Sequence, residues 1–101
     1  MNISNNVSSI QAHQTMLNVN ANNVANVNTD EFRPSETRIS NDTNSVSANV
    51  HLADDTGSAK SQTDLTKEFP EQIIAADAVA VNVQAIRTRE DMLGTLLDMK
   101  V

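Results

Sequence analysis

The chain has 101 residues, of which 39% are hydrophobic and only two, Phe32 and Phe69, are aromatic. A core this small, without Trp or Tyr, lacks the side chains that contribute most to burial, so we expect the chain to complete its core by packing on neighbours. The net charge of −6 argues against binding to nucleic acids or acidic membrane surfaces, and the absence of Cys excludes disulfides and thiolate metal sites.

The first segment, residues 1–29, contains no Asp, Glu, Lys or Arg. Its apolar residues recur in steps of three and four, which predicts a helix over about 4–27 with a coiled-coil-like seam. Asn recurs six times between positions 18 and 28. Because Asn is a poor helix former, we expect the order of this helix to depend on packing. The seam consists of Ile3, Val7, Ile10, Leu17, Ala21 and Val24.

The second segment, residues 30–63, is rich in Ser, Thr and Asn and reads as a polar loop with a short strand or hairpin. Val46, Ala48, Val50 and Leu52 alternate with polar residues, which predicts one half-buried strand. A turn is expected after it, at residues 54–57.

The third segment, residues 64–101, predicts a long helix with Asp64 as its N-terminal cap. Pro70 predicts either a kink or a loose turn over 64–69 before a main helix of about 70–99. The fold class expected is therefore mainly α, with two long terminal helices packed as an antiparallel coiled-coil-like pair and a short irregular or β middle. The seam predicted for the terminal helix contains Leu65, Phe69, Ala76, Val83, Ile86, Leu93 and Leu97, with Gln72, Val79 and Glu90 at the intervening positions.

Catalytic patterns are absent from the sequence. His13 and His51 lie in different segments without the close His or Cys companions of a zinc site, and no glycine-rich phosphate loop occurs. We therefore expect no enzyme activity, no metal and no cofactor; a small hydrolase or metal enzyme is the least favoured alternative. No stretch approaches the roughly 20 apolar residues that cross a bilayer, so direct membrane insertion is not expected.

The two apolar seams have two interpretations. They bury one another in a self-contained helical hairpin, or they join helices from several chains. We favour packing between several chains, because two helices alone leave the flanks of their apolar stripes partly exposed to water. Asn18, Asn22 and Asn26 form a charge-free stripe that suits a helix surrounded by other protein.

Residues 17–33 carry a more specific pattern. Residues 21–29, Ala-Asn-Asn-Val-Ala-Asn-Val-Asn-Thr, with Phe32 and Arg33 after them, resemble the N-terminal signature of bacterial flagellar rod and hook proteins. Residues 64–69, 71–76, 82–88 and 91–100 are similar to the terminal helix of the same family. The motif residues, which the resemblance makes candidates for an assembly interface, are Ala21, Asn22, Asn23, Val24, Ala25, Asn26, Asn28, Thr29 and Phe32.

The chain departs from this family at four places. Glu31 replaces a Gly, and a residue with a Cβ adopts a left-handed conformation only at a cost. Pro70 stands where the family has an ordinary helix former, and residues 79–81 lack a usual Tyr. The middle segment is too short for the outer β-domains of hook proteins, so the closest resemblance is to a short proximal-rod protein.

The resemblance implies a structural subunit of the flagellar axis, whose terminal helices assemble into a tube that transmits torque. The implied partners are other axial subunits, as a homo- or hetero-oligomer, and the type III export apparatus. The implied location is the periplasmic part of the basal body, reached without a cleaved signal peptide. The alternative is a stand-alone helical-hairpin module that interacts with or regulates flagellar assembly.

Overall fold

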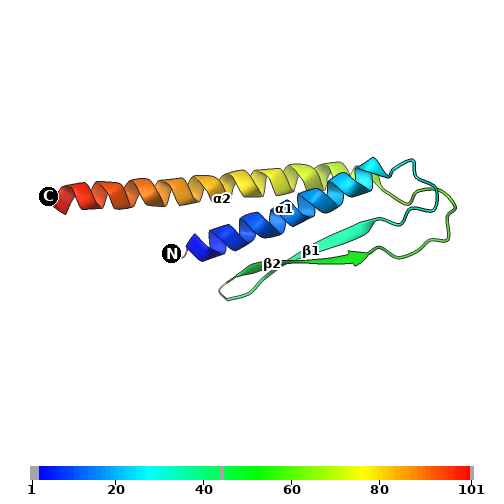
Figure 1. The fold of residues 1–101 in the computed structure, drawn as a ribbon, viewed down its shortest axis with the longest axis horizontal. Helices are drawn as coiled ribbons and strands as arrows, with labels where there is room; N and C mark the ends of the chain where they lie inside the picture. Colours follow the sequence, from blue (N-terminus) through cyan, green and yellow to red (C-terminus); the bar gives the residue numbers. More distant parts are fainter. Residues whose placement is uncertain (1–2, 44, 101) are drawn as a thin grey trace.

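The computed structural model describes residues 3–43 and 45–100, and it contains two long helices with a β-hairpin between them (Figure 1). Helix α1 spans Ile3–Ala25, strands β1 and β2 span Ser35–Asn41 and Val46–Leu52, and helix α2 spans Leu65–Lys100. The helices run antiparallel side by side, and the hairpin packs along α1. The molecule is long and thin, with extents of 68 × 23 × 15 Å. The expected fold class, mainly α with two terminal helices and a β middle, is confirmed.

Helix α1 ends at Ala25, where side chains of the Asn-rich motif close its last turn. Asn26 Nδ2 donates to the Asn22 carbonyl oxygen at 2.9 Å, and Thr29 Oγ1 donates to Asn26 Oδ1 at 3.0 Å. Backbone bonds satisfy the last carbonyl groups: the Asn26 N–H donates to the Asn22 and Asn23 carbonyl oxygens at 3.2 and 3.3 Å, and the Val27 N–H donates to the Val24 carbonyl oxygen at 3.1 Å. The helix is thus slightly displaced from the predicted range of about 4–27.

Helix α2 begins at Leu65 and continues through Pro70 to Lys100. Asp64 caps it as predicted: its Oδ1 accepts a hydrogen bond from the Thr66 N–H at 3.0 Å, and its carbonyl oxygen accepts one from the Glu68 N–H at 2.9 Å. The loose turn predicted over 64–69 is not observed, since those residues form the cap and the first turns. Pro70 is close enough to the helix start that its missing N–H removes only one bond of the ladder.

The hairpin pairs β1 and β2 in antiparallel register, from Ser35 opposite Leu52 to Asn41 opposite Val46. Strand β2 occupies the range in which the sequence alternates. The sequence pattern did not predict β1, because Ile39 is the only apolar residue in that strand. The backbone turn predicted at residues 54–57 is not observed; instead Gly57, with a φ of 78°, donates its N–H to Asp55 Oδ1 at 2.8 Å.

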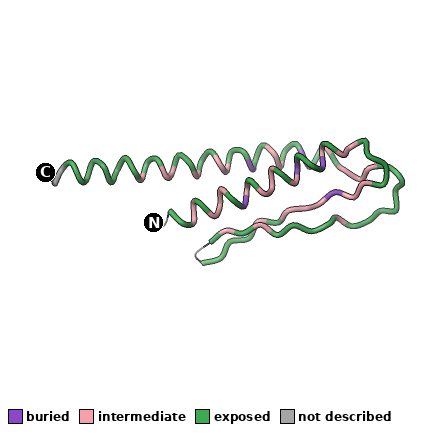
Figure 2. The backbone as a smooth tube through the Cα atoms, in the orientation of Figure 1, coloured by how far each residue is buried: buried purple, intermediate pink, exposed green. Residues whose placement is uncertain are grey.

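Very few apolar side chains are fully buried in the described part of the chain. Ala12 and Ala75 are the only buried hydrophobic residues, whereas Asn20, Asn23 and Glu68 are buried polar residues with at most 3% of their surface exposed. Buried positions cluster where the two helices and the start of β1 meet (Figure 2). The core of the monomer is therefore small and largely polar.

Hydrogen bonds fix the register of the helix pair. Asn23 Nδ2 donates to Glu68 Oε1 at 2.9 Å, and Asn82 Nδ2 donates to Ser9 Oγ at 3.0 Å. Both helices advance 14 residues between these two points, as expected for straight antiparallel helices. Successive residues of an α-helix turn by about 100°. The α2 face directed at α1 therefore comprises Glu68, Gln72, Ala75, Val79, Asn82 and Ile86.

Candidate assembly interface

A buried cluster of hydrogen bonds ties the end of α1 to the starts of β1 and α2. We call it the polar junction: Asn20, Asn23, Ser35, Thr63 and Glu68. Asn23 Nδ2 donates to the Ser35 carbonyl oxygen at 2.7 Å and to Glu68 Oε1, while Asn23 Oδ1 accepts from the Ser35 N–H at 3.0 Å. Thr63 Oγ1 donates to the Asn23 carbonyl oxygen at 3.0 Å. One side chain thus joins three segments that are far apart in sequence.

Glu68 is a carboxylate held in a nearly closed environment, with 3% of its surface exposed. Burial is the main effect on its pKa and raises it, and the hydrogen bond from Asn23 opposes that rise by favouring the charged form. The neighbouring cation, Lys67, bonds instead to Glu36 Oε1 at 2.9 Å and lies 4.0 Å from Glu71. Glu68 therefore has no counter-ion of its own.

The Glu68 carboxylate faces an amide donor of Asn23, and the Thr63 hydroxyl group of the junction is bonded to the Asn23 carbonyl oxygen. Across the described residues, no group of three or more His, Cys, Asp or Glu side chains could hold a metal ion. His13 bonds to the Ser9 carbonyl oxygen within its own helix, and His51 lies 3.2 Å from Glu36 on the exposed side of the hairpin. No helix in the part of the chain described is long and apolar enough to cross a membrane.

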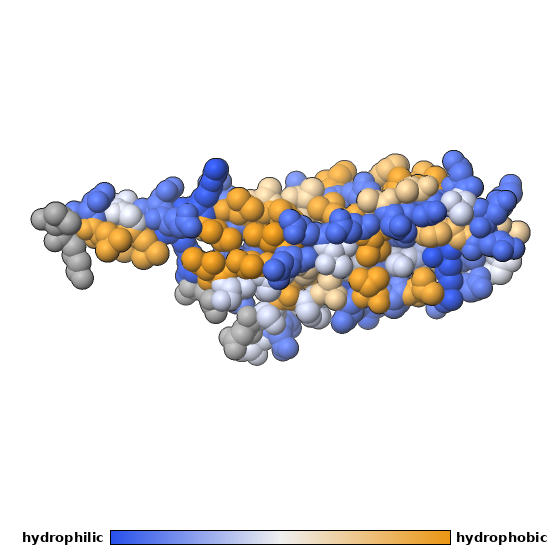
Figure 3. All heavy atoms as spheres, in the orientation of Figure 1, coloured by the Kyte–Doolittle hydropathy of each residue, from blue (hydrophilic) through white to orange (hydrophobic). Residues whose placement is uncertain are grey.

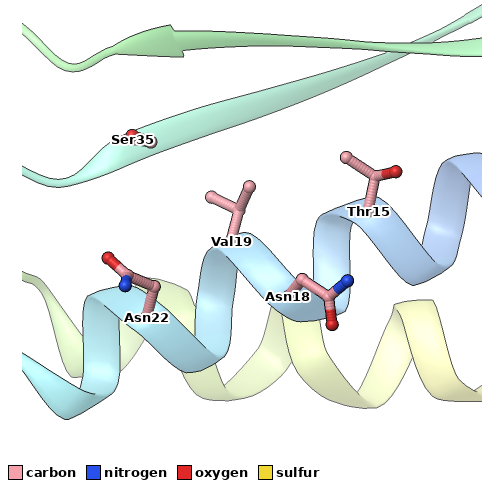
Figure 4. A pocket seen from close by; sticks show the side chains of 5 residues that line it. All are labelled: Thr15, Asn18, Val19, Asn22 and Ser35. Carbon is pink, nitrogen blue, oxygen red and sulfur yellow. The ribbon is translucent and has the colours of Figure 1, made fainter.

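A shallow groove runs between α1 and the hairpin. Its volume is about 240 Å³, and it is lined by Thr15, Asn18, Val19, Asn22 and Ser35. Figure 4 shows Thr15 and Val19 directed from α1 toward β1. The lining contains no charged side chain, so a neighbouring protein segment could be received there without desolvation of an ion.

Apolar side chains project from helix α2 on both flanks of its contact with α1. Nine large hydrophobic residues of this helix are exposed, from 43% for Val83 to 68% for Val81. The side opposite the contact is polar, with Asp77, Gln84 and Asp91 along it, so the exposed apolar surface of α2 lies on its two flanks and at its overhanging end. One flank carries Phe69, Ile73, Ala76, Ala80 and Val83, and the other carries Ile74, Ala78, Val81, Ala85, Met92 and Leu96.

The C-terminal part of α2 extends beyond α1. Continuing the helix register places Ile3 level with Thr88, so residues 89–100 overhang by about 18 Å at 1.5 Å per residue. Leu93 and Leu97 continue the face that α1 covers further along, yet they are 56% and 65% exposed. Figure 3 shows hydrophobic atoms along this overhanging end. At the start of the overhang an open cavity of about 460 Å³ is lined by Ile3, Arg89, Met92, Leu93 and Leu96.

The motif residues divide between the inside and the outside of the fold. Asn23 holds the polar junction, Asn26 and Thr29 close the end of α1, and Val24 and Phe32 are half-buried. Five of the nine are exposed and are available to a neighbouring chain: Ala21, Asn22, Ala25, Asn28 and Thr29.

Glu31 occupies the position at which the resembled signature has Gly, and it adopts a left-handed φ of 61°. The turn at this residue is therefore left-handed although the side chain carries a Cβ. Its N–H donates to the Ala59 carbonyl oxygen at 2.8 Å, and the Gln62 N–H donates to the Phe32 carbonyl oxygen at 3.0 Å. These bonds hold the segment before α2 against the end of the motif.

The seam predicted for the terminal helix does not coincide with the contact between the helices of one chain. Leu65 and Ile86 are half-buried, whereas Phe69, Ala76, Val83, Leu93 and Leu97 are exposed. A strict seven-residue repeat drifts by about 20° per heptad on a straight helix. The stripe therefore begins on one flank of α2 and reaches the α1-facing side only near Ile86.

Sequence reasoning missed Asn20 and Glu68 as members of a buried cluster, and Ile73, Ile74 and Val81 as exposed apolar residues. The sequence signal for the exposed residues was the presence of apolar residues on both flanks of the helix, outside the predicted seam. Comparison of the chain with models of protein families and with curated proteins finds no match.

Proposed function

We propose that this chain is a structural subunit of the bacterial flagellar axis, which assembles through its terminal helices into the helical tube of the rod. Its partners are other axial subunits, in homo- or hetero-oligomeric contacts, and it reaches the periplasmic part of the basal body through the type III export apparatus. The role is structural and involves neither catalysis nor a cofactor. The family resemblance of the motif and of the terminal helix suggests this identity.

The observation that carries the proposal is the apolar character of both flanks of α2 and of its overhanging end. Large side chains on both flanks and on the overhanging end are exposed in the single chain. An array of parallel subunits surrounds each helix with others and would cover all three surfaces. A lone monomer leaves them in water.

The energies favour several contacts over one. Burying a large apolar side chain contributes about 1.5–3 kcal/mol, so half-covered residues each gain about 1 kcal/mol. Association costs roughly 4–15 kcal/mol. One flank, with three or four such residues, contributes about 3–4 kcal/mol, at most the lower end of that cost, whereas all nine together contribute on the order of 10 kcal/mol, in the middle of its range. Assembly is therefore expected when several faces are covered at once, as in a helical array.

The test compares Leu93→Asp with a matched control, Gln84→Asp, in cells from which the chain has been deleted. Both residues are exposed on α2, so neither substitution should alter the fold of the isolated chain. Purified basal bodies should contain the wild-type chain and the Gln84 variant but not the Leu93 variant. Absence of the wild-type chain from basal bodies, or normal incorporation of Leu93→Asp, would contradict the proposal. Val24→Asp should also block incorporation.

The alternative, a stand-alone helical-hairpin module, draws support from the polar junction, which closes within one chain. It predicts strong protection of both helices from amide hydrogen exchange in a monomer at low concentration. The axial subunit predicts protection near the junction and rapid exchange over the overhanging end of α2. Exchange measured segment by segment distinguishes the two.

A further inference from the structure

Hydrogen bonds at both ends of the hairpin fix which of its residues bond across to the opposite strand. The Asp42 N–H donates to the Ser45 carbonyl oxygen at 2.7 Å, and the Ala53 N–H donates to the Pro34 carbonyl oxygen at 2.9 Å. Both pairs continue the register of the strands, in which bonded pairs alternate with pairs whose main-chain groups point outward. The residues of β2 that direct both groups away from β1 are therefore Val46, Ala48, Val50 and Leu52.

Helix α1 closes one end of each outer edge of the hairpin. On β1, the polar junction occupies the main-chain groups of Ser35, and on β2, Ser8 Oγ accepts a hydrogen bond from the Val46 N–H at 3.0 Å. The end of β2 lies farther from α1 than the start of β1 (Figures 1 and 4). Within the part of the chain that the structure describes, the outward main-chain groups of residues 48–52 meet no partner. Val50 is the centre of this open edge.

We propose that the open edge of β2 binds the same edge of a second copy of the chain, so that two hairpins form one antiparallel sheet. A two-fold axis at Val50 uses the whole open edge. Val50 exchanges two main-chain hydrogen bonds with its copy, and Ala48 of each chain does so with Leu52 of the other. A two-stranded sheet is marginal alone, and additional strands stabilise it.

This contact is independent of the proposed function in the flagellar axis. An isologous pair closes on itself, whereas a head-to-tail array repeats one contact from subunit to subunit without such an axis. The pairing is therefore assigned to the chain in solution. It buries a part of the molecule that the proposed assembly through the flanks of α2 does not use.

The sequence of β2 lacks the features that keep strand edges apart. Edge strands are commonly protected by charged residues or Pro, and β2 contains no Asp, Glu, Lys, Arg or Pro. Strand β1, in contrast, carries Glu36 and Arg38. Pairing about Val50 places Asn49 of one copy opposite His51 of the other, so no like charges face each other across the axis.

The apolar side chains of β2 are complementary in the same register. Val50 and Leu52 are 48% and 55% exposed in the single chain. On the side of the sheet that faces α1, Val50 meets its copy, and the large side chain of Leu52 lies opposite the small one of Ala48. A recess of about 210 Å³ with Ala12, Val46 and Ala48 in its lining lies beside this position. Leu52 of the second copy can occupy it.

The experiment measures the association of the full-length chain by sedimentation equilibrium from micromolar to millimolar concentration. The wild type should form a reversible dimer. Val50→Pro removes one intermolecular hydrogen bond from each copy but none within the hairpin, so it should weaken dimerisation at least about tenfold. Thr37→Pro is the matched control, because Thr37 lies opposite Val50 and directs its N–H to the other edge of the hairpin.

The controls also separate this contact from axial assembly. Thr37→Pro and Leu93→Asp should both leave the dimer intact, although Leu93→Asp should block incorporation into basal bodies. A wild-type chain that stays monomeric throughout the range overturns the proposal. So does a dimer that either control weakens as much as Val50→Pro does.

Single cysteines test the register without removing a main-chain N–H. The chain has no Cys of its own, and the Cα atoms of a bonded antiparallel pair lie about 5.5 Å apart, within disulfide range. Val50→Cys should therefore give a covalent dimer on mild oxidation or with a short thiol crosslinker, whereas Thr37→Cys should not. Equal yields of crosslinked dimer from the two variants would overturn the pairing.

Discussion

The prediction that tests the fold most directly concerns Asn23, whose side chain makes three hydrogen bonds at the polar junction. Replacing Asn23 with Ala leaves Glu68 Oε1 and the main-chain N–H and carbonyl oxygen of Ser35 without their partner. A buried polar group that loses its partner costs about 1–3 kcal/mol. Because Ser35 is only half-buried and Glu68 can take up a proton, we assign about 1 kcal/mol, the lower end of this cost, to each of the three groups that lose a partner. The expected loss is about 3 kcal/mol, or a factor of about 150 in the folding equilibrium.

The adjacent Asn22 provides a matched control, because it has the same side chain in the same helix but is exposed. Asn22→Ala should stabilise the chain by up to about 0.5 kcal/mol, since Ala is the better helix former. Urea unfolding followed by circular dichroism measures both variants. If Asn23→Ala costs less than about 1 kcal/mol, or no more than Asn22→Ala, the junction does not hold the fold as described.

A second substitution at the same site separates the donor from the acceptor. Asn23→Asp keeps an oxygen for the Ser35 N–H but replaces the donating Nδ2 with an oxygen facing Glu68 and the Ser35 carbonyl. At neutral pH this places like charges together, so the loss should exceed that of Asn23→Ala. In acid the loss should shrink as a carboxyl group becomes protonated. Equal losses at both pH values would show that the hydrogen-bonding pattern is not what matters.

Three further predictions concern the backbone and the helix cap. Glu31→Gly should raise the free energy of unfolding by about 0.5 kcal/mol, because removing the steric strain of a Cβ at a positive φ outweighs the greater entropy that Gly gives the unfolded chain. Asp30→Gly should lower the free energy of unfolding, because only the entropy effect applies there. Pro70→Ala should raise it by about 1–3 kcal/mol, because an N–H becomes available to the Thr66 carbonyl oxygen; both are measured by urea unfolding. Hydrogen bonds from Thr66 lower the pKa of Asp64 in the folded chain. The contribution of Asp64 to the free energy of unfolding is therefore present above pH 3.8 and is lost as pH falls through the folded pKa. Asp64→Asn should remove this loss, which thermal unfolding in acid measures.

The elements of this fold could largely be predicted from local patterns. Apolar spacing indicated both helices, the carboxylate of Asp64 indicated the start of the second, and alternation indicated β2. Strand β1 escaped detection because its partner, and not its own sequence, determines it. The alternative of a loose turn over 64–69 is wrong, since a helix tolerates proline near its start.

The polar junction could not be predicted in the same way. Asn23 and Glu68 lie 45 positions apart, and each has a sufficient local explanation, in a motif and in the first turn of a helix. Burial of a carboxylate is rare without a partner, so the sequence favours an exposed Glu. The position of the α1-facing side of α2 was equally hidden, because apolar residues occur on both flanks of that helix as well.

The distribution of polar and apolar groups is the reverse of that in a self-contained helical hairpin. The inner contact between the helices is held by hydrogen bonds of Asn23 and Asn82, while most large apolar side chains of α2 point away from it. Directional bonds that satisfy each other in one register fix how the chain folds on itself. In the proposed assembly, the outward apolar surface would supply the non-directional attraction for neighbours. Under that proposal the chain sets its own shape first and gains further stability on assembly, so charge substitutions on the apolar flanks should spare the isolated chain and block the assembly.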